Sequence, residues 1–272
     1  MSTDPNTTWG DLNRRRRLRQ YASFASDAPE GKTPSKEMQD FYRRADTDLN
    51  RLSHLTPYNR SATVVDGKPL NESTVTSPSG RSCILSQQPM PGDHYRFWKA
   101  RYENAASNQY PSADVDPESS TSVVVRLNQM EEHHMTADDD YLPLNGSKTR
   151  TFTSSDGQEE LTLAQIGEAV WWPEKGATER TFNLTSNWDS RVHTVHHLFK
   201  GDWEDSDRLR GAQVDELVNL VKYVNSIRRK TRCSVVYHCF AGIGRSASTG
   251  LLGFAFEEGA RHFVAKCPLS PS

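Results

Sequence analysis

Short apolar segments alternate with long polar tracts along this chain, and the spacing of the apolar residues predicts both strands and helices. The β-branched run at residues 122–125 is typical of a strand, and so is the run at residues 234–237. Residues 191–199 alternate polar with apolar or histidine side chains, so we expect a third strand with one buried face.

Two helices follow from a different spacing. Between Val214 and Ile227, apolar residues recur every three or four positions, which predicts an amphipathic helix with a basic end. Residues 245–258 are apolar nearly all round, so we expect a buried helix there. The order of strand 234–237, a glycine-containing turn and this helix is typical of a loop that binds an oxyanion.

Composition and charge exclude several classes of protein. Apolar residues make up 35% of the 272, which indicates a folded core with long polar segments. The net charge of −2 argues against a dedicated nucleic-acid binder, and no apolar stretch is long enough to insert into a membrane. The 4 cysteines have neither the pairing of a disulfide scaffold nor a metal-ligand pattern, so they indicate no metal site. We also expect no other cofactor.

The polar tracts suggest the domain organisation. We interpret residues 1–34 as a polar, disordered arm and residues 35–272 as one domain. The tracts at residues 107–121 and 145–160 are interpreted as surface insertions in this domain. We expect a cytoplasmic protein, and the basic run Arg14–Arg17 leaves a nuclear location open.

Residues 238–246, with the sequence HCFAGIGRS, carry the most specific chemistry. Cys239 ends a predicted strand, and a helix begins at about Arg245, so backbone N–H groups between them converge on one point. Such a point binds a phosphate dianion and stabilises a cysteine thiolate, which would make Cys239 a nucleophile. An inert buried cysteine in a strand–turn–helix junction is the alternative.

The other residues of this loop fit the same chemistry. Gly242 and Gly244 lack a Cβ atom where the backbone approaches an anion or adopts a positive φ. The planar guanidinium of Arg245 can donate to two phosphoryl oxygens, and Ser246 can donate to the cysteine sulfur.

HCFAGIGRS resembles the signature loop of the cysteine-dependent protein tyrosine phosphatases, and the resemblance extends over roughly residues 35–259. It implies an α/β fold with a twisted mixed sheet flanked by helices. It also implies hydrolysis of phosphotyrosine in proteins through a phosphocysteine intermediate, without a metal. The catalytic residues would be Cys239, Arg245 and Ser246, the loop residues Phe240, Ala241, Gly242, Ile243 and Gly244 would bind the phosphate, and His238 would support the loop.

A general acid is expected on a second loop. Trp203-Glu204-Asp205 follows the predicted strand 191–199 and resembles the family's Trp-Pro-Asp loop, with Glu204 in place of proline. The resemblance makes Asp205 the acid that protonates the leaving oxygen, and Trp203 the anchor of the loop. A solvated acidic turn is the alternative.

Weaker matches lie upstream. Residues 50–58 are similar to the family's phosphotyrosine-recognition segment, but Leu52 replaces its stacking aromatic residue and His54 replaces its aspartate. Loss of the aromatic ring weakens selectivity for phosphotyrosine, so broader phosphoester specificity stays open. The resemblance assigns Glu132 to the positioning of Arg245, and Trp172-Pro173 is similar to the family's Tyr-Trp-Pro.

The C-terminal end departs from the family. Only 27 residues follow Arg245, from 272 − 245, and none matches the family's glutamine that positions the hydrolytic water. We therefore expect a C-terminally shortened phosphatase domain. An impaired phosphatase-like domain that binds phosphorylated partners is the alternative function, and the oligomeric state stays open.

Overall fold

The computed structural model describes residues 61–77, 79–104, 115–116, 118–129, 140–143, 146–205 and 207–266, together with residues 52, 55 and 57. All of them belong to the unit Arg44–Ser272. Side chains of the last helix are described as far as Gly259. The predicted arm, residues 1–34, lies outside the described residues, as do His54 and Glu132.

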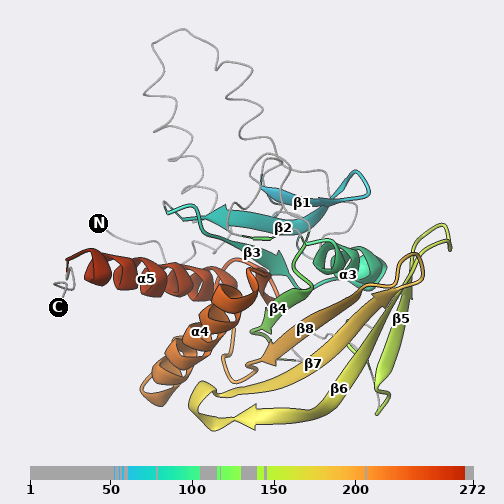
Figure 1. Ribbon diagram of the computed structural model, residues 1–272. Coiled ribbons are helices and arrows are strands. Elements are labelled where there is room, and N and C mark those ends of the chain that lie inside the picture. Colours follow the sequence, from blue (N-terminus) through green and yellow to red (C-terminus); the bar gives the residue numbers. More distant parts are fainter. Residues whose placement is uncertain are drawn as a thin grey trace, which may run out of the picture. The chain divides into compact units, whose positions relative to one another are not determined.

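A mixed sheet forms the centre of the described structure (Figure 1). Its nine strands lie in the order β1-β2-β3-β9-β4-β8-β7-β6-β5. The four central strands β3, β9, β4 and β8 are parallel to one another, and the outer strands pair antiparallel. The predicted mixed sheet flanked by helices is confirmed. The strands are β1 (Ala62–Val65), β2 (Lys68–Thr76), β3 (Ser82–Gln87), β4 (Thr121–Arg126), β5 (Thr149–Thr153), β6 (Glu160–Trp172), β7 (Ala177–Ser186), β8 (Val192–Phe199) and β9 (Ser234–Cys239).

Helices cover both faces of the sheet. Side chains of a strand alternate between faces, and β4 shows this directly. Its Val123 and Val125 pack in one core with α4 and α5, whereas Val124 packs in a second core with α3. All three valines are fully buried, and each contributes roughly 1.5–3 kcal/mol by leaving water. The helical elements are η1 (Pro91–Asp93), α3 (His94–Tyr102), η4 (Pro173–Lys175), α4 (Ala212–Thr231) and α5 (Arg245–Lys266).

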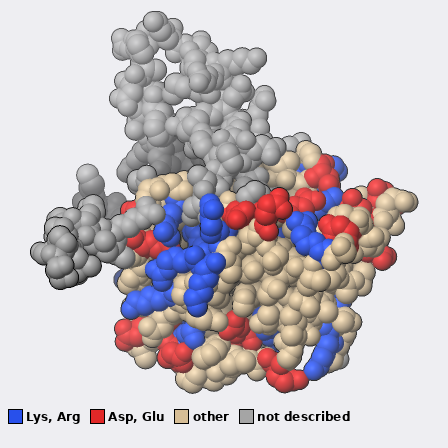
Figure 2. All heavy atoms as spheres, in the orientation of Figure 1, with Lys and Arg blue, Asp and Glu red and all other residues tan. Residues whose placement is uncertain are grey.

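The three predicted strands and the amphipathic helix are confirmed as β4, β8, β9 and α4. Along α4, Leu217, Val221 and Val224 are buried, but Val214 at its start is exposed. The basic end of α4 carries the exposed side chains of Arg229 and Lys230. Figure 2 shows Lys and Arg side chains gathered on the face over α4 and α5. Cations at a helix C-terminus are favoured by the helix dipole, which gives this cluster a structural explanation.

Two predictions about this domain are wrong. Residues 145–160 are more than a surface insertion, because Thr149–Thr153 forms the edge strand β5 of the sheet. The helix from Arg245 is not buried all round, since Ser248 and Ala255 are exposed and Leu251 is 64% exposed. These three residues recur at helical spacing and form one stripe, which the other described elements leave uncovered. Among the helices that the structure describes, none combines the length and the hydrophobicity of a transmembrane segment.

Candidate active site

The loop between β9 and α5 surrounds the predicted nucleophile. Cys239 is the last residue of β9 and is 2% exposed. The backbone N–H of Gly242 donates to its Sγ over 3.3 Å, so the loop turns back over the sulfur. α5 begins at Arg245, where its N-terminal N–H groups add to the positive potential of the loop. This arrangement favours an anion at the centre of the loop, which is the environment that a thiolate nucleophile requires.

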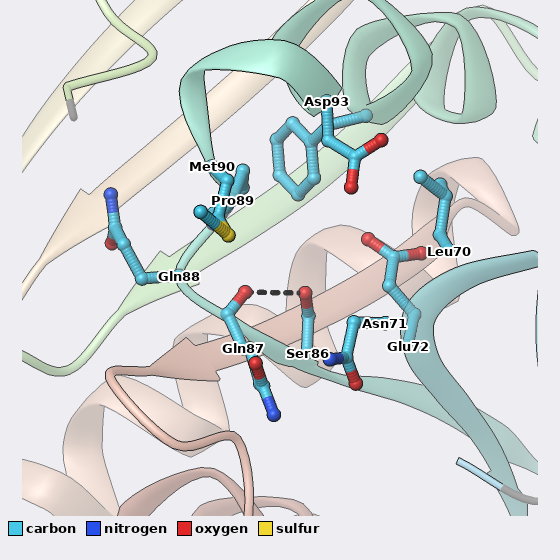
Figure 3. A pocket seen from close by; sticks show the side chains of 10 residues that line it. Leu70, Asn71, Glu72, Ser86, Gln87, Gln88, Pro89, Met90 and Asp93 are labelled. Atoms are coloured by element: carbon cyan, nitrogen blue, oxygen red, sulfur yellow. Dashed lines mark hydrogen bonds between the residues drawn. The ribbon is translucent and has the colours of Figure 1, made fainter. Parts of the chain in front are cut away.

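The backbone conformation and the close contacts at Gly242 require a glycine, whereas the described protein atoms place no such demand on Gly244. Gly242 has φ +75°, and a Cβ atom there would lie 2.7 Å from backbone atoms of Ser86 and Gln87. Figure 3 shows these two residues at the end of β3, where the hydroxyl of Ser86 donates to the carbonyl of Gln87. Gly244 has no positive φ, and a Cβ atom there would meet no atom of the described residues within 4 Å. The positive-φ explanation therefore does not apply to Gly244, and the expected close approach of its backbone to an anion stays a prediction.

The remaining loop residues differ in exposure. The Phe240 carbonyl accepts from the N–H of Gln88 over 3.3 Å, which ties the loop to the segment after β3. Ala241 is half-buried, and the side chain of Ile243 is 53% exposed at the rim of the loop. Ser246 is fully buried, and its hydroxyl has no hydrogen-bond partner among the described residues.

Arg245 connects this loop to the loop that carries the predicted acid. Its guanidinium is buried and donates to the carbonyl of Trp203 over 2.9 Å and to a carboxylate oxygen of Asp205 over 3.2 Å. Trp203 is itself buried in the core, and its indole N–H donates to the carbonyl of Asp207 over 3.1 Å. The structure thus brings Cys239, Arg245 and Asp205 together from two loops that are 34 residues apart, from 239 − 205.

The other carboxylates of this second loop have different surroundings. Asp202 is bonded to Lys200, and the Asp207 carboxylate accepts from the backbone N–H of Arg208. The Glu204 side chain is exposed. Among these acids Asp205 is therefore the one that contacts the phosphate loop.

His238 and Tyr141 form a buried network beneath the nucleophile. The tyrosine hydroxyl is hydrogen-bonded to the Nε2 atoms of His238 and His197, the latter at 2.9 Å. Burial lowers the pKa of both histidines well below the usual value, and the nearby Arg126 guanidinium lowers it further. Both rings therefore stay neutral, and the hydroxyl can donate to one and accept from the other.

Tyr141 and Arg126 were missed by sequence reasoning. The tyrosine bonded to the strand before the phosphate loop is Tyr141, which is followed by Leu142 and Pro143. Trp172, which the sequence resemblance matches to the family's Tyr-Trp-Pro, lies elsewhere and donates its indole N–H to Glu179 on β7. The signal in the sequence was a tyrosine two residues before a proline. Arg126 is 1% exposed and pairs with Asp140 over 3.2 Å. No pattern in the sequence marks this ion pair, because its two residues are 14 positions apart in the chain.

The segment that contains Leu52 is hydrogen-bonded to the C-terminal end of β3, beside Cys239. The amide of Gln87 donates to the carbonyl of Leu55 over 2.8 Å, and the Leu55 N–H donates to the carbonyl of Leu52 over 2.8 Å. Gln87 is also the strand partner of Cys239. Leu52 is half-buried. The predicted role of Glu132 toward Arg245 lies outside the described residues and stays a prediction.

Comparison with known proteins decides the family. A family model described as protein-tyrosine phosphatase matches residues 46–262. The chain belongs to the protein-tyrosine phosphatase family.

Relatives of this phosphatase-family chain are distant and longer. The chain is 25% identical over 232 residues to tyrosine-protein phosphatase non-receptor type 13 of Mus musculus, covering 79% of this chain and 8% of that protein. It is 24% identical over 208 residues to tyrosine-protein phosphatase 3 of Schizosaccharomyces pombe, covering 73% of this chain and 61% of that protein. The chain thus spans less than two thirds of the length of either relative.

Solved structures agree on the fold. A structure of PTPN18 superposes with a TM-score of 0.60 at 16% identity, covering 79% of this chain and 69% of that one. The structure of the Trypanosoma cruzi protein tyrosine phosphatase TcPTP1 gives a TM-score of 0.59 at 17% identity, covering 92% and 78%. At these identities the likeness concerns the fold.

Proposed function

We propose that this chain is a protein tyrosine phosphatase that hydrolyses phosphotyrosine in proteins through a phosphocysteine intermediate. The observation that carries the proposal is the double contact of Arg245 with Trp203 and Asp205. It brings a phosphate-binding guanidinium, a carboxylic acid and the loop around Cys239 to one place.

In the first chemical step, the substrate phosphate occupies the loop amides and the guanidinium of Arg245. The Cys239 thiolate attacks phosphorus, so that an S–P bond forms and the P–O bond to tyrosine breaks. Asp205 donates its proton to the leaving phenolate oxygen. The phenolate that leaves from phosphotyrosine is basic, because the pKa of tyrosine is about 10, so its departure depends strongly on this proton transfer.

In the second step, water attacks the phosphocysteine, an O–P bond forms and the S–P bond breaks. Asp205, now ionised, accepts the proton of the water, and the thiolate is regenerated. We assign Ser246 to the departure of the sulfur, because its buried hydroxyl has no hydrogen-bond partner among the described residues and is available to donate to Sγ as the thiolate leaves. Positioning and charge stabilisation supply most of the rate enhancement.

A phosphotyrosine-peptide assay for released phosphate tests the proposal. We expect steady turnover that vanadate blocks and that Cys239→Ser abolishes. Cys233→Ser is the matched control, because Cys233 is a buried free cysteine directly before the same strand, outside the phosphate loop, and its replacement should leave turnover intact. A single burst, with peptide binding retained by Cys239→Ser, would instead support a binding domain. Turnover that survives Cys239→Ser would contradict the proposed nucleophile.

A further inference from the structure

The loop that carries Asp205, residues 201–211, is fastened at both ends to the first turns of α4. At its start, the ammonium of Lys200 bonds both carboxylate oxygens of Asp202, at 2.9 and 3.1 Å. The same ammonium donates to the carboxylate of Glu216 on α4 over 2.8 Å. Lys200 is fully buried, whereas Glu216 is largely buried and Asp202 is partly exposed.

A single glutamine joins the two ends of this loop. The side-chain amide of Gln213 donates to the carbonyl of Asp202 over 3.4 Å. Its amide oxygen accepts from the backbone N–H of Arg210 over 3.3 Å. Both bonds hold backbone atoms, so they fix the path of the chain on each side of Asp205. We call Lys200, Asp202, Gln213 and Glu216 the loop clasp.

The clasp is packed against a third element. Gly176, after η4, has φ +54°, and a Cβ atom there would lie 2.5 Å from the ammonium of Lys200 and closer still to the carboxylate of Glu216. Lys200 also continues from β8, where its N–H donates to the carbonyl of Arg126 over 2.9 Å. The clasp therefore links the sheet, η4 and α4 to the base of the loop.

We infer that Gln213 and the Lys200–Glu216 pair are positioning residues that hold Asp205 at the leaving oxygen of the substrate. This inference rests on the proposed function, because it acts through the proton that Asp205 donates. Among the described residues, the hydrogen bonds and ion pairs of the clasp side chains go to one another and to the backbone of Asp202 and Arg210, and not to the phosphate loop. Their effect is on the placement of the acid, where a displacement of about 1 Å is enough to lower the rate about a hundredfold.

The leaving group of the substrate separates this role from a general effect on folding. A nitrophenyl phosphate releases a weakly basic phenolate that needs little protonation, whereas phenyl phosphate releases a phenolate similar to tyrosine, with a pKa of about 10. Loss of a placed general acid costs about 10²–10⁴-fold where protonation is needed. Asp205→Asn gives the size of that loss in this protein.

The experiment compares kcat/KM for both substrates in Gln213→Met, which keeps the length of the side chain and removes both hydrogen bonds. This ratio reports the first chemical step, whereas kcat also includes hydrolysis of the phosphocysteine, which is common to both substrates. We expect kcat/KM for phenyl phosphate to fall about tenfold, a fraction of the Asp205→Asn loss, and kcat/KM for nitrophenyl phosphate to change less than about twofold. The control is Gln165→Met, because Gln165 is also half-buried and donates to a nearby backbone carbonyl, that of Gly167.

Two glycine substitutions test the contribution of the Lys200–Glu216 ion pair. Gly176→Ala and Gly157→Ala both place a Cβ on a positive-φ residue, but only Gly176 has clasp atoms within 4 Å. We expect only Gly176→Ala to lose more activity toward phenyl phosphate than toward nitrophenyl phosphate. Equal losses on both substrates, or no loss on either, would overturn the inference while leaving the phosphatase proposal intact. Absence of turnover in the unmodified chain would overturn both.

Discussion

Replacing Gly242 by alanine perturbs the phosphate loop at its tightest point. The residue has φ +75°, and the added Cβ would lie 2.7 Å from the N of Gln87 and from the C and O of Ser86. The left-handed conformation costs a non-glycine residue about 1–2 kcal/mol. Overpacking against atoms that cannot rotate away adds about 1–3 kcal/mol. We therefore expect Gly242→Ala to lose about 2–5 kcal/mol of unfolding free energy.

The loss is large enough to measure by thermal unfolding. One kcal/mol lowers the Tm of a domain of this size by about 2–4 °C, so the expected decrease is about 4–20 °C. Activity should fall as well, because the N–H of Gly242 points at the Cys239 sulfur and one misplaced donor at an anion site costs about 10²–10³-fold in kcat.

Gly244→Ala provides the internal comparison. Gly244 lies in the same loop, has no positive φ and has open space at its Cβ position. Its unfolding free energy should stay within about 0.5 kcal/mol of the unmodified chain. If Gly242→Ala kept both its Tm and its kcat/KM, or if both variants lost the same stability, the argument from the loop geometry would be refuted.

Three further changes test the site and the buried sheet that carries it. Arg245→Lys should lower kcat/KM by about 10²–10³-fold, because an ammonium cannot make two parallel bonds to phosphoryl oxygens. A loss below tenfold in the phosphate-release assay would contradict two-bond binding of the phosphate by the Arg245 guanidinium. Burial lowers the pKa of His193 to about 4, so between pH 6.5 and pH 4 the unfolded chain takes up a proton that the folded chain does not. Stability should therefore fall on acidification by about 1.4 kcal/mol per pH unit for this histidine, and urea unfolding at pH 7 and pH 5 should show a smaller difference in His193→Gln. Leu52→Tyr restores a stacking ring and should improve kcat/KM several-fold for phosphotyrosine over phosphothreonine peptides; an unchanged ratio would mean that Leu52 does not contact the phenyl ring.

Local sequence is enough to predict the phosphate loop and the elements around it. The loop from His238 to Ser246 is contiguous, so its turn, its glycine and the start of α5 depend on neighbouring residues. The strands β4, β8 and β9 and the helix α4 could also be predicted from the sequence. Apolar residues that recur every two positions, or every three to four, indicate which face of a strand or helix is buried. The strand β5 was hidden in a polar tract, since an edge strand of threonines has no apolar period.

Contacts between side chains that are distant in the sequence could be found only from the folded structure. The bond of Tyr141 to His238 joins residues 97 positions apart, and that of Arg245 to Asp205 joins residues 40 apart. The exposed stripe of α5 around Leu251 could not be predicted from the sequence either, because the burial of an apolar helix depends on which elements pack against it. Local spacing specifies backbone conformation through short-range sterics and hydrogen bonds. Contacts between loops arise only after the sheet has set the relative positions of its strand ends, and no period in the sequence encodes them.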